Sequence, residues 1–246
     1  MLAIIGGSGL ARLGILEGAH RKQVRTPYGE PSAPLALGRI ADTEVAFLAR
    51  HGEGHTLAPH EVNYRANVWA LKDAGAGAVV SVATVGVIRS GVAPGGLLVP
   101  DQVIDYTWGR RSSFFEGTGS PVKHIDFTEP YSPPLRQRIL AAGAACREPL
   151  IDGGVYATTQ GPRLETAAEI NRLERDGADI VGMTAMPEAS LARELGLEYA
   201  AIAVIANHAA GRGDAAHAVP LDKIEAILEE AMDRVRRILV KLCEPR

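Results

Sequence analysis

The sequence predicts an α/β fold: a single domain with a central, mostly parallel mixed β-sheet flanked by helices. Short aliphatic runs alternate with amphipathic segments along the chain, and this alternation is typical of α/β proteins. The 246 residues are 46% hydrophobic and 22% charged, which is enough for one hydrophobic core over residues 1–246. The sequence has 27 glycines and 15 prolines but only 5% aromatic residues. We therefore expect many tight turns around an aliphatic interior.

Five aliphatic runs are predicted to form the strands of the sheet. Each run is short and bounded by turn residues, as is typical of strands that are covered on both faces. In chain order, the predicted strands are residues 2–5, 45–49, 78–85, 180–183 and 200–206.

Four amphipathic segments between and after these runs are predicted to be helices. Apolar residues recur in them at helical spacing. The predicted helices are residues 61–74, 165–176, 188–195 and 221–242. A glycine directly follows three of them, at the place where glycine commonly ends a helix: Gly75, Gly177 and Gly196.

The stretch 99–134 is rich in proline and glycine, and its apolar residues follow neither the spacing of a helix nor that of a strand. We expect it to form long loops. Loops of this length inside a compact domain usually carry function or lie at an interface.

The charge balance favours a small ligand over a macromolecular one. Lys and Arg (26) nearly balance Asp and Glu (29), and the formal net charge is −3. This balance does not indicate a surface for nucleic acid or for an anionic membrane. The N-terminal segment lacks the basic region of a signal peptide, and no apolar run approaches the roughly 18 residues that span a bilayer. We expect a cytoplasmic protein that does not enter the membrane.

The cysteines and histidines argue against a metal site. Cys146 and Cys243 are the only cysteines, which excludes a disulfide framework and a cysteine-rich metal centre and suits a reducing compartment. The histidines lack the spacing to cysteines or carboxylates that metal sites show. We therefore expect no metal.

Two motifs at predicted strand ends have the chemistry of an anion site. The first, Gly6-Gly7-Ser8-Gly9, lets backbone N–H groups and a hydroxyl face an anion, although a plain turn is an alternative. The second contains Arg50 and His51. Arginine binds phosphate as a planar fork, and histidine adds a donor or moves a proton. The alternatives for this pair are a surface ion pair and a hydrogen-bonded structural histidine.

Two further strand ends add hydroxyl groups. Thr84 follows Ala83 near the end of one strand, and Thr184 follows Met183 at the end of another. Ligands of open α/β sheets bind at strand ends. Convergence of these four strand ends would therefore create a site for free phosphate.

Two polar residues are candidates for recognising a heterocycle. Glu165 and Asn207 follow other predicted strand regions, and a carboxylate with a carboxamide can pair with the edge of a base. Helix capping is the alternative for both residues.

Taken in order, these stretches resemble the trimeric purine nucleoside phosphorylases over nearly the whole chain, in the branch that contains the methylthioadenosine phosphorylases. The matching segments are IIGGSGL (4–10), TPYG (26–29), LARHG (48–52), VNYRAN (62–67), GPR (161–163) and MT (183–184). The resemblance implies phosphorolysis of a purine nucleoside in a homotrimer or dimer of trimers, with active sites at subunit interfaces. Inorganic phosphate is then a co-substrate, and no cofactor is required.

The resemblance also implies roles for individual residues. The implied phosphate-binding residues are Ser8, Arg50, His51, Ala83, Thr84 and Thr184. The implied nucleoside-binding residues are Leu164, Glu165, Met183, Asn207, Ala209, Leu221, Ile224 and, from a neighbouring subunit, His124. Catalysis falls to Asn207, which activates the leaving base, and to His51, which holds the phosphate.

The residues at the base positions favour a 6-oxopurine. The family's 6-aminopurine enzymes have Asp at the position of Asn207, a second Asp at the position of Ala209 and Ser at the position of Glu165. A carboxylate accepts the N1–H of a 6-oxopurine but repels the N1 lone pair of adenine. Apolar Leu221 and Ile224 favour a substrate with a 5′-methylthio group. His217 is nearby, and a histidine at this place would favour a substrate with a 5′-hydroxyl.

S-Methyl-5′-thioinosine is therefore the expected substrate. The alternatives are inosine or guanosine, then 5′-methylthioadenosine. A nucleosidase that uses water, and a purine-binding protein without catalysis, are less favoured.

Overall fold

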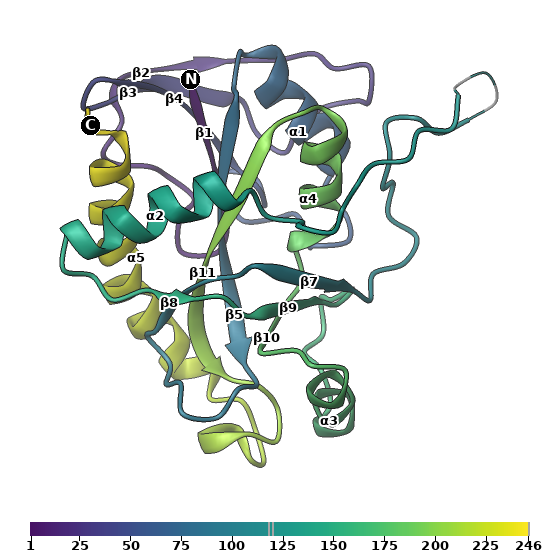
Figure 1. Cartoon of the computed structure of the whole chain (residues 1–246), viewed down its shortest axis with the longest axis vertical. Coiled ribbons are helices and arrows are strands. Elements are labelled where there is room, and N and C mark those ends of the chain that lie inside the picture. The colour runs from purple at the N-terminus through teal and green to yellow at the C-terminus, as the bar shows by residue number, and fades with distance from the viewer. Residues whose placement is uncertain (118, 120, 246) are drawn as a thin grey trace.

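A mixed sheet of 11 strands forms the centre of the computed structural model, which describes residues 1–117, 119 and 121–245 (Figure 1). At its centre, β1 (Leu2–Gly6) runs parallel to β4 (Thr43–Ala49) on one side and to β5 (Ala78–Val87) on the other. The long strand β11 (Glu198–His208) is parallel to β5 along the opposite edge. The residues of β1 are all buried and aliphatic or glycine, which confirms a parallel sheet centre covered on both faces.

The outer strands make the sheet mixed. On one side, the antiparallel strands β3 (Leu35–Ile40) and β2 (Glu17–Lys22) extend it beyond β4. On the other side, β10 (Ile180–Gly182) is antiparallel to β5 and leads to the parallel strands β9 (Val155–Thr158) and β7 (Gln102–Asp105). The short strand β6 (Leu97–Val99) pairs with β11, and β8 (Ile151–Asp152) pairs with β6.

One edge of β5 changes partners along its length, and this change positions the site. Residues 78–81 pair with β1, and residues 86–87 pair with β10. The segment 82–85 lies between these two ladders, with β11 paired on its other edge. The ends of β1, β4 and β10 therefore approach one another in front of residues 82–85.

Five helices within the described residues cover the sheet. Figure 1 shows α2 (Pro133–Ala145) with α5 (Leu221–Cys243) on one side of the long central strands, and α1 (Tyr64–Asp73) with α4 (Ala185–Glu194) on the other. A shorter helix, α3 (Ala167–Arg175), follows β9. None of the helices in these residues is both long and apolar enough to cross a bilayer.

Side-chain caps and glycines explain where several helices begin and end. The Asn63 side chain caps α1, and Thr166 and Glu169 form a capping box at α3, which satisfies N–H groups that a helix start leaves free. The three predicted glycine stops have positive φ angles of 96°, 94° and 65°, a conformation that glycine adopts without strain. These are Gly75, Gly177 and Gly196.

The predicted α/β fold is confirmed, and each predicted strand and helix is present with ends shifted by a few residues. The structure adds β2, β3, β6, β8, β9 and α2, which were not predicted. The expectation of long loops over 99–134 is partly wrong, because β7 and the start of α2 fall in this stretch. Residues 118 and 120 of the stretch lie outside the described part of the chain.

Candidate active site

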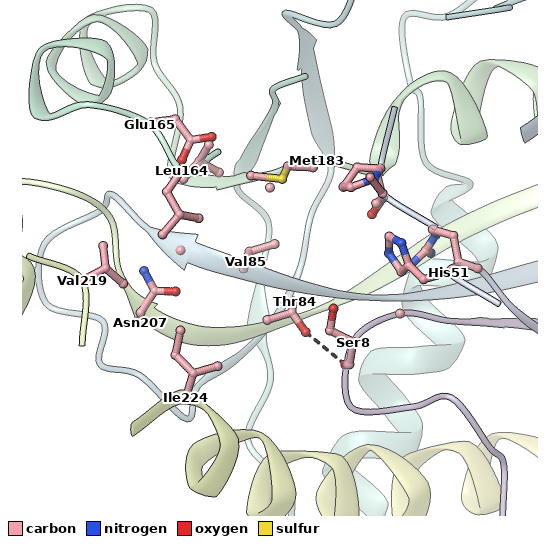
Figure 2. Close-up of a pocket in the computed structure, with 18 of the residues that line it drawn as sticks. Ser8, His51, Thr84, Val85, Leu164, Glu165, Met183, Asn207, Val219 and Ile224 are labelled. Carbon is pink, nitrogen blue, oxygen red and sulfur yellow. Dashed lines mark hydrogen bonds between the residues drawn. The ribbon is translucent and has the colours of Figure 1, made fainter. Parts of the chain in front are cut away.

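A cavity of about 420 Å³ opens beside residues 84–86 of β5 (Figure 2). Side chains from the ends of β1, β4, β5, β10 and β11 line it, together with residues from the loops that follow them. Figure 2 shows His51, Ser8 and Thr84 toward one end and Glu165, Leu164 and Asn207 toward the other, with Met183 between them. Charged and polar groups therefore face a shared cavity from both of its ends.

The cationic end contains a fully buried arginine with a defined partner. Arg50 Nε donates to Glu188 Oε2 at 2.8 Å, and Nη2 donates to Glu188 Oε1 at 3.1 Å. Nη2 also donates to Ser81 Oγ at 2.6 Å, and Nη1 donates to the Val82 carbonyl at 3.1 Å. Burial alone would lower the pKa of Arg50, but the Glu188 carboxylate outweighs it and raises that pKa above its ordinary value. The guanidinium therefore stays charged, and its plane is fixed.

Glu188 is completely buried and was missed as a site residue. Its carboxylate also accepts hydrogen bonds from Ser81 Oγ and from the Tyr199 hydroxyl, both at 2.8 Å. The sequence predicted this residue only as the start of a helix, whereas the structure places its carboxylate in the core beside Arg50. The surface ion pair considered for Arg50 is wrong, since this ion pair is buried.

His51 is held in one tautomer beside Arg50. Its Nδ1 is 2.8 Å from the Leu57 carbonyl oxygen, and a carbonyl can only accept, so Nδ1 carries the proton. Burial, and then the charge of Arg50, lower the pKa of His51 to about 4. At neutral pH the ring is therefore uncharged, and Nε2 has a free lone pair.

The turn after β1 brings a hydroxyl close to these groups. A Cβ atom on Gly7 would lie 2.7 Å from Arg50 Nη1 and 2.7 Å from the Val82 carbonyl oxygen, so this position accepts only glycine without a shift of its neighbours. Thr84 Oγ1 donates to the Ser8 carbonyl at 3.1 Å, and Ser8 Oγ is 3.4 Å from His55 Nε2. Backbone and side-chain groups of this turn are thereby held at the cavity wall.

The other end of the cavity contains a carboxylate and a carboxamide. Glu165 Oε1 accepts a hydrogen bond from Thr159 Oγ1 at 2.5 Å. Asn207 Nδ2 donates to the His208 carbonyl at 2.6 Å, which leaves one amide hydrogen and the amide oxygen for other partners. The helix caps considered for these two residues are wrong, because Thr166 caps α3 and Asn207 lies within β11.

Most of the residues that the sequence assigned to the site line the cavity. They are Ser8, Arg50, His51, Thr84, Leu164, Glu165, Met183, Thr184, Asn207, Ala209 and Ile224. Their roles in binding and catalysis remain predictions.

Three assigned residues lie elsewhere. Ala83 packs into the core of the sheet, because side chains alternate along β5 and Thr84 takes the cavity side. Leu221 is 64% exposed at the start of α5 and borders a neighbouring hollow with His217. His124 is exposed in the loop between β7 and α2, outside the cavity of its own chain.

The structure adds lining residues that the sequence did not indicate. His55, Thr56, Leu57, Ala58 and Pro59 line the cavity, and so does Val219. The loop 55–59 directly follows the Arg50 motif. This closeness in sequence was the one feature that could have indicated these residues as part of the site.

Arg110, in the loop after β7, connects the segments that follow two strands. Its Nη1 donates to the carbonyl oxygens of Met183 at 2.8 Å and Met186 at 2.6 Å. Its Nη2 donates to the carbonyl oxygen of Gln160 at 2.8 Å. The segments that follow β9 and β10 are therefore fixed relative to each other by one side chain.

The described residues contain no candidate set of metal ligands. Among the residues that the structure describes, no group of three or more His, Cys, Asp or Glu side chains could hold a metal ion.

A cavity at the strand ends of an α/β sheet, with a buried arginine and hydroxyl groups at one end and a carboxylate and a carboxamide at the other, has the form of a small-molecule site in this class of fold. Comparison with known proteins then gives the family. The model described as "Phosphorylase superfamily" matches residues 1–244. The chain therefore belongs to the phosphorylase superfamily.

Individual relatives agree with this assignment. The chain is 56% identical over 214 residues to a "Probable S-methyl-5'-thioinosine phosphorylase" from Xanthomonas campestris, with 87% of this chain and 86% of that protein covered. It is 45% identical over 215 residues to a "6-oxopurine nucleoside phosphorylase" from Pyrococcus furiosus, with 85% and 80% covered. The structure of methylthioadenosine phosphorylase from Schistosoma mansoni in complex with adenine superposes with a TM-score of 0.91 at 34% identity, with 98% and 90% covered. The chain is thus an enzyme of the purine nucleoside phosphorylase type.

Proposed function

We propose that this enzyme cleaves a 6-oxopurine nucleoside with inorganic phosphate, and that its substrate is S-methyl-5′-thioinosine. The products are hypoxanthine and 5-methylthioribose 1-phosphate. One observation carries the proposal: Glu165 and Asn207 share a cavity with Arg50 and His51. A base-reading end and a phosphate-binding end are thereby separated by the space for a sugar.

Hydrogen-bond complementarity selects the base. A 6-oxopurine presents an N1–H that the Glu165 carboxylate accepts, and its O6 accepts the amide N–H of Asn207. The amide oxygen of Asn207 accepts the N7–H that forms as the base departs. Adenine presents a lone pair at N1, which faces the carboxylate unfavourably. A site that hydrogen-bonds its substrate in this way discriminates by about 10⁴-fold or more, since a mismatch leaves buried polar groups unpaired.

The names of the relatives and the apolar wall support the 5′-methylthio group. Val219 and Ile224 line the cavity beside Asn207, and Leu57, Ala58 and Pro59 line it further along. The more similar of the two relatives above has S-methyl-5′-thioinosine in its name. Inosine or guanosine is the second candidate, because His217 borders the adjoining hollow and offers a polar partner for a 5′-hydroxyl.

Phosphate is the nucleophile in the mechanism that we propose. Arg50, Ser8 and Thr184 hold the dianion beneath the anomeric carbon, together with Thr84, whose hydroxyl turns from the Ser8 carbonyl to the anion. Neutral His51 accepts the P–OH hydrogen bond at Nε2. The glycosidic bond lengthens first, and the anion below stabilises the oxocarbenium-like sugar. Asn207 stabilises the charge that builds on the purine. Overall, the C1′–N9 bond breaks, a C1′–O bond to phosphate forms, and the proton of hydrogen phosphate ends on the departing base.

The assembly and surroundings belong to the same proposal. We propose a cytoplasmic homotrimer or dimer of trimers in which His124 reaches a neighbour's site. Phosphate is the co-substrate, and the proposed reaction needs no metal or organic cofactor.

A phosphate-dependent release assay tests the function. Purified enzyme is given S-methyl-5′-thioinosine, 5′-methylthioadenosine, inosine, guanosine and adenosine in parallel, with and without phosphate. We expect the fastest base release from S-methyl-5′-thioinosine, and only with phosphate. Equal rates without phosphate would indicate a nucleosidase, and tight binding without turnover would indicate a purine-binding protein.

A substitution tests the base assignment separately. We expect Asn207→Asp to shift the ratio of kcat/KM values toward 6-aminopurines, because a protonated Asp donates to adenine N7. An unchanged substrate ratio would contradict the role of Asn207.

A further inference from the structure

A hydroxyl group lies directly against the carboxylate of Glu165. Thr159 Oγ1 is 2.5 Å from Glu165 Oε1, whereas its other polar neighbour, the Gly182 carbonyl oxygen, is 3.3 Å away. A threonine hydroxyl has a single proton to donate. An ionised carboxylate is the stronger acceptor, and hydrogen bonds to it are short. The Thr159 hydroxyl therefore donates to Glu165 rather than to Gly182.

The donor belongs to the sheet, and the acceptor belongs to a loop. The Thr159 N–H continues the β9–β10 ladder by donating to the Gly182 carbonyl at 2.8 Å. The Thr159 carbonyl accepts from Arg110 Nη2 at 3.3 Å. Glu165 lies between the end of β9 and the start of α3, outside both elements. A rigid strand end thus holds the side chain of a residue in a connecting segment, as a precise binding site requires.

We propose that Thr159 is a positioning residue that sets the specificity for 6-oxopurines, an inference that rests on the function proposed above. Its hydroxyl occupies Oε1 of Glu165 and leaves Oε2 to accept the N1–H of the base. Held in this orientation, the carboxylate presents an acceptor to the edge of the base. An acceptor there pairs with the N1–H of a 6-oxopurine and faces the N1 lone pair of a 6-aminopurine unfavourably, so Thr159 works against the second base.

The test removes the hydroxyl and keeps the shape of the side chain. The ratio of kcat/KM for S-methyl-5′-thioinosine to kcat/KM for 5′-methylthioadenosine is measured for the wild type and for Thr159→Val. We expect this ratio to fall by about 10-fold or more, which is the effect of losing one hydrogen bond to a charged group. The KM for phosphate should stay unchanged, because phosphate binds at the other end of the cavity. Thr159→Ala is the second hydroxyl-free variant, should the valine variant fold poorly.

Two variants separate positioning from a structural effect. Thr159→Ser keeps the hydroxyl and should restore the ratio to within about threefold of wild type. Thr158→Val is the matched control on the preceding residue of β9, since the Thr158 hydroxyl is buried and has no hydrogen-bond partner in the described part of the chain. It should leave the ratio unchanged.

The outcomes distinguish this inference from the proposed function. A wild-type ratio retained by Thr159→Val and Thr159→Ala overturns the inference and leaves the function standing. An equal shift in Thr158→Val, or no recovery in Thr159→Ser, also overturns it. A wild-type enzyme that prefers 5′-methylthioadenosine, or cleaves neither nucleoside, overturns the proposed substrate and the inference together.

Discussion

At the scale of single residues, the buried charge of Arg50 depends on Glu188 as its counter-ion. The two side chains are 1% and 0% exposed, so neither charge has water as an alternative partner. Removing one member of a buried pair leaves the other charge uncompensated, which is more costly than the pair itself is stabilising. The pair therefore fixes the guanidinium plane at the cavity wall. Loss of either partner would destabilise the fold strongly.

Glu188→Gln tests this dependence. We expect the free energy of unfolding to fall by about 3–5 kcal/mol, because Arg50 keeps its charge and loses its counter-ion. Among the molecules that stay folded, the KM for phosphate should rise by about 10-fold or more, since the arginine is no longer held in place. Urea unfolding and initial rates at varied phosphate concentration measure the two effects.

Glu53→Gln is the control for this substitution. Glu53 forms an ion pair with Arg21 in which the two side chains are 41% and 65% exposed. Exposed pairs contribute at most about 1 kcal/mol, so this variant should unfold like the wild type. A similar loss of stability in both variants would contradict the special position of Glu188.

His51 predicts a pH dependence of stability. Its pKa is lowered to about 4 in the folded protein, against about 6.5 in the unfolded chain. Between these values the unfolded state binds more protons than the folded state, so stability falls as the pH falls from about 6.5 to 4. Burial is the main cause, because it disfavours the charged ring.

The comparison between wild type and His51→Asn isolates this contribution. The asparagine keeps a donor near the Leu57 carbonyl but does not titrate in this range. Urea unfolding at pH 7 and pH 5 should show a larger loss of stability for the wild type than for the variant. Identical losses in the two proteins would show that His51 does not take up a proton on unfolding.

At the scale of elements, the sequence predicted the parts whose local signal is strong. Continuous aliphatic runs identified β1, β4, β5, β10 and β11, and the motifs at their ends identified most of the cavity wall. The strand β2 was missed because all six of its residues are exposed and its side chains lack an apolar alternation. It forms only because β3 offers a pairing edge.

Helix α2 and the buried Glu188 show two further limits. The Ser132 cap followed by Pro133 marks the start of α2 and is a signal for a helix start. It was missed because the surrounding prolines favoured a loop. Glu188 was predicted only as the first residue of a helix. Its burial and its position opposite Arg50 come from the tertiary structure.

Arg110 connects elements in a way that sequence patterns do not reveal. It donates to carbonyl oxygens after β9 and after β10, and its guanidinium lies 5.4 Å from the centre of the Tyr64 ring. We expect Arg110→Met to let these two segments move apart. A shift of about 1 Å at a reacting centre costs about 10²-fold in rate, so kcat/KM for the nucleoside should fall to that extent.

Arg111→Met is the matched control. Its side chain is 75% exposed and pairs with Glu116, so its removal should leave kcat/KM and the melting temperature close to wild type. Equal kinetics for both variants would show that Arg110 does not fix the strand ends.

At the scale of the whole molecule, the split edge of β5 explains why a phosphate site and a base site share one cavity. The ends of β1 and β4 lie on one side of the unpaired segment of this edge, and the end of β10 lies on the other. The long pairing of β11 with the other edge of β5 places Asn207 after the bulge that follows Ile205. Each strand end thus contributes a different part of the site.

One part of the proposed site is absent from the cavity of a single chain. His124 is exposed in the loop before α2, and the proposed assembly places it in a neighbour's site. We expect His124→Ala to raise the KM for the nucleoside and to leave the KM for phosphate unchanged. This split is the first indication that the residue acts at the 5′ end of the substrate.

Mixed oligomers decide whether His124 acts in its own subunit or in its neighbour. His124→Ala and Asn207→Ala chains are co-refolded in equal amounts. If each site combines Asn207 from one subunit with His124 from the next, about a quarter of the sites regain both residues in a closed ring. Activity should then rise several-fold above the mean of the two separate variants. Co-refolding Asn207→Ala with the double variant should give no recovery, since no site then contains Asn207, and activity at the mean in the first mixture would contradict a shared site.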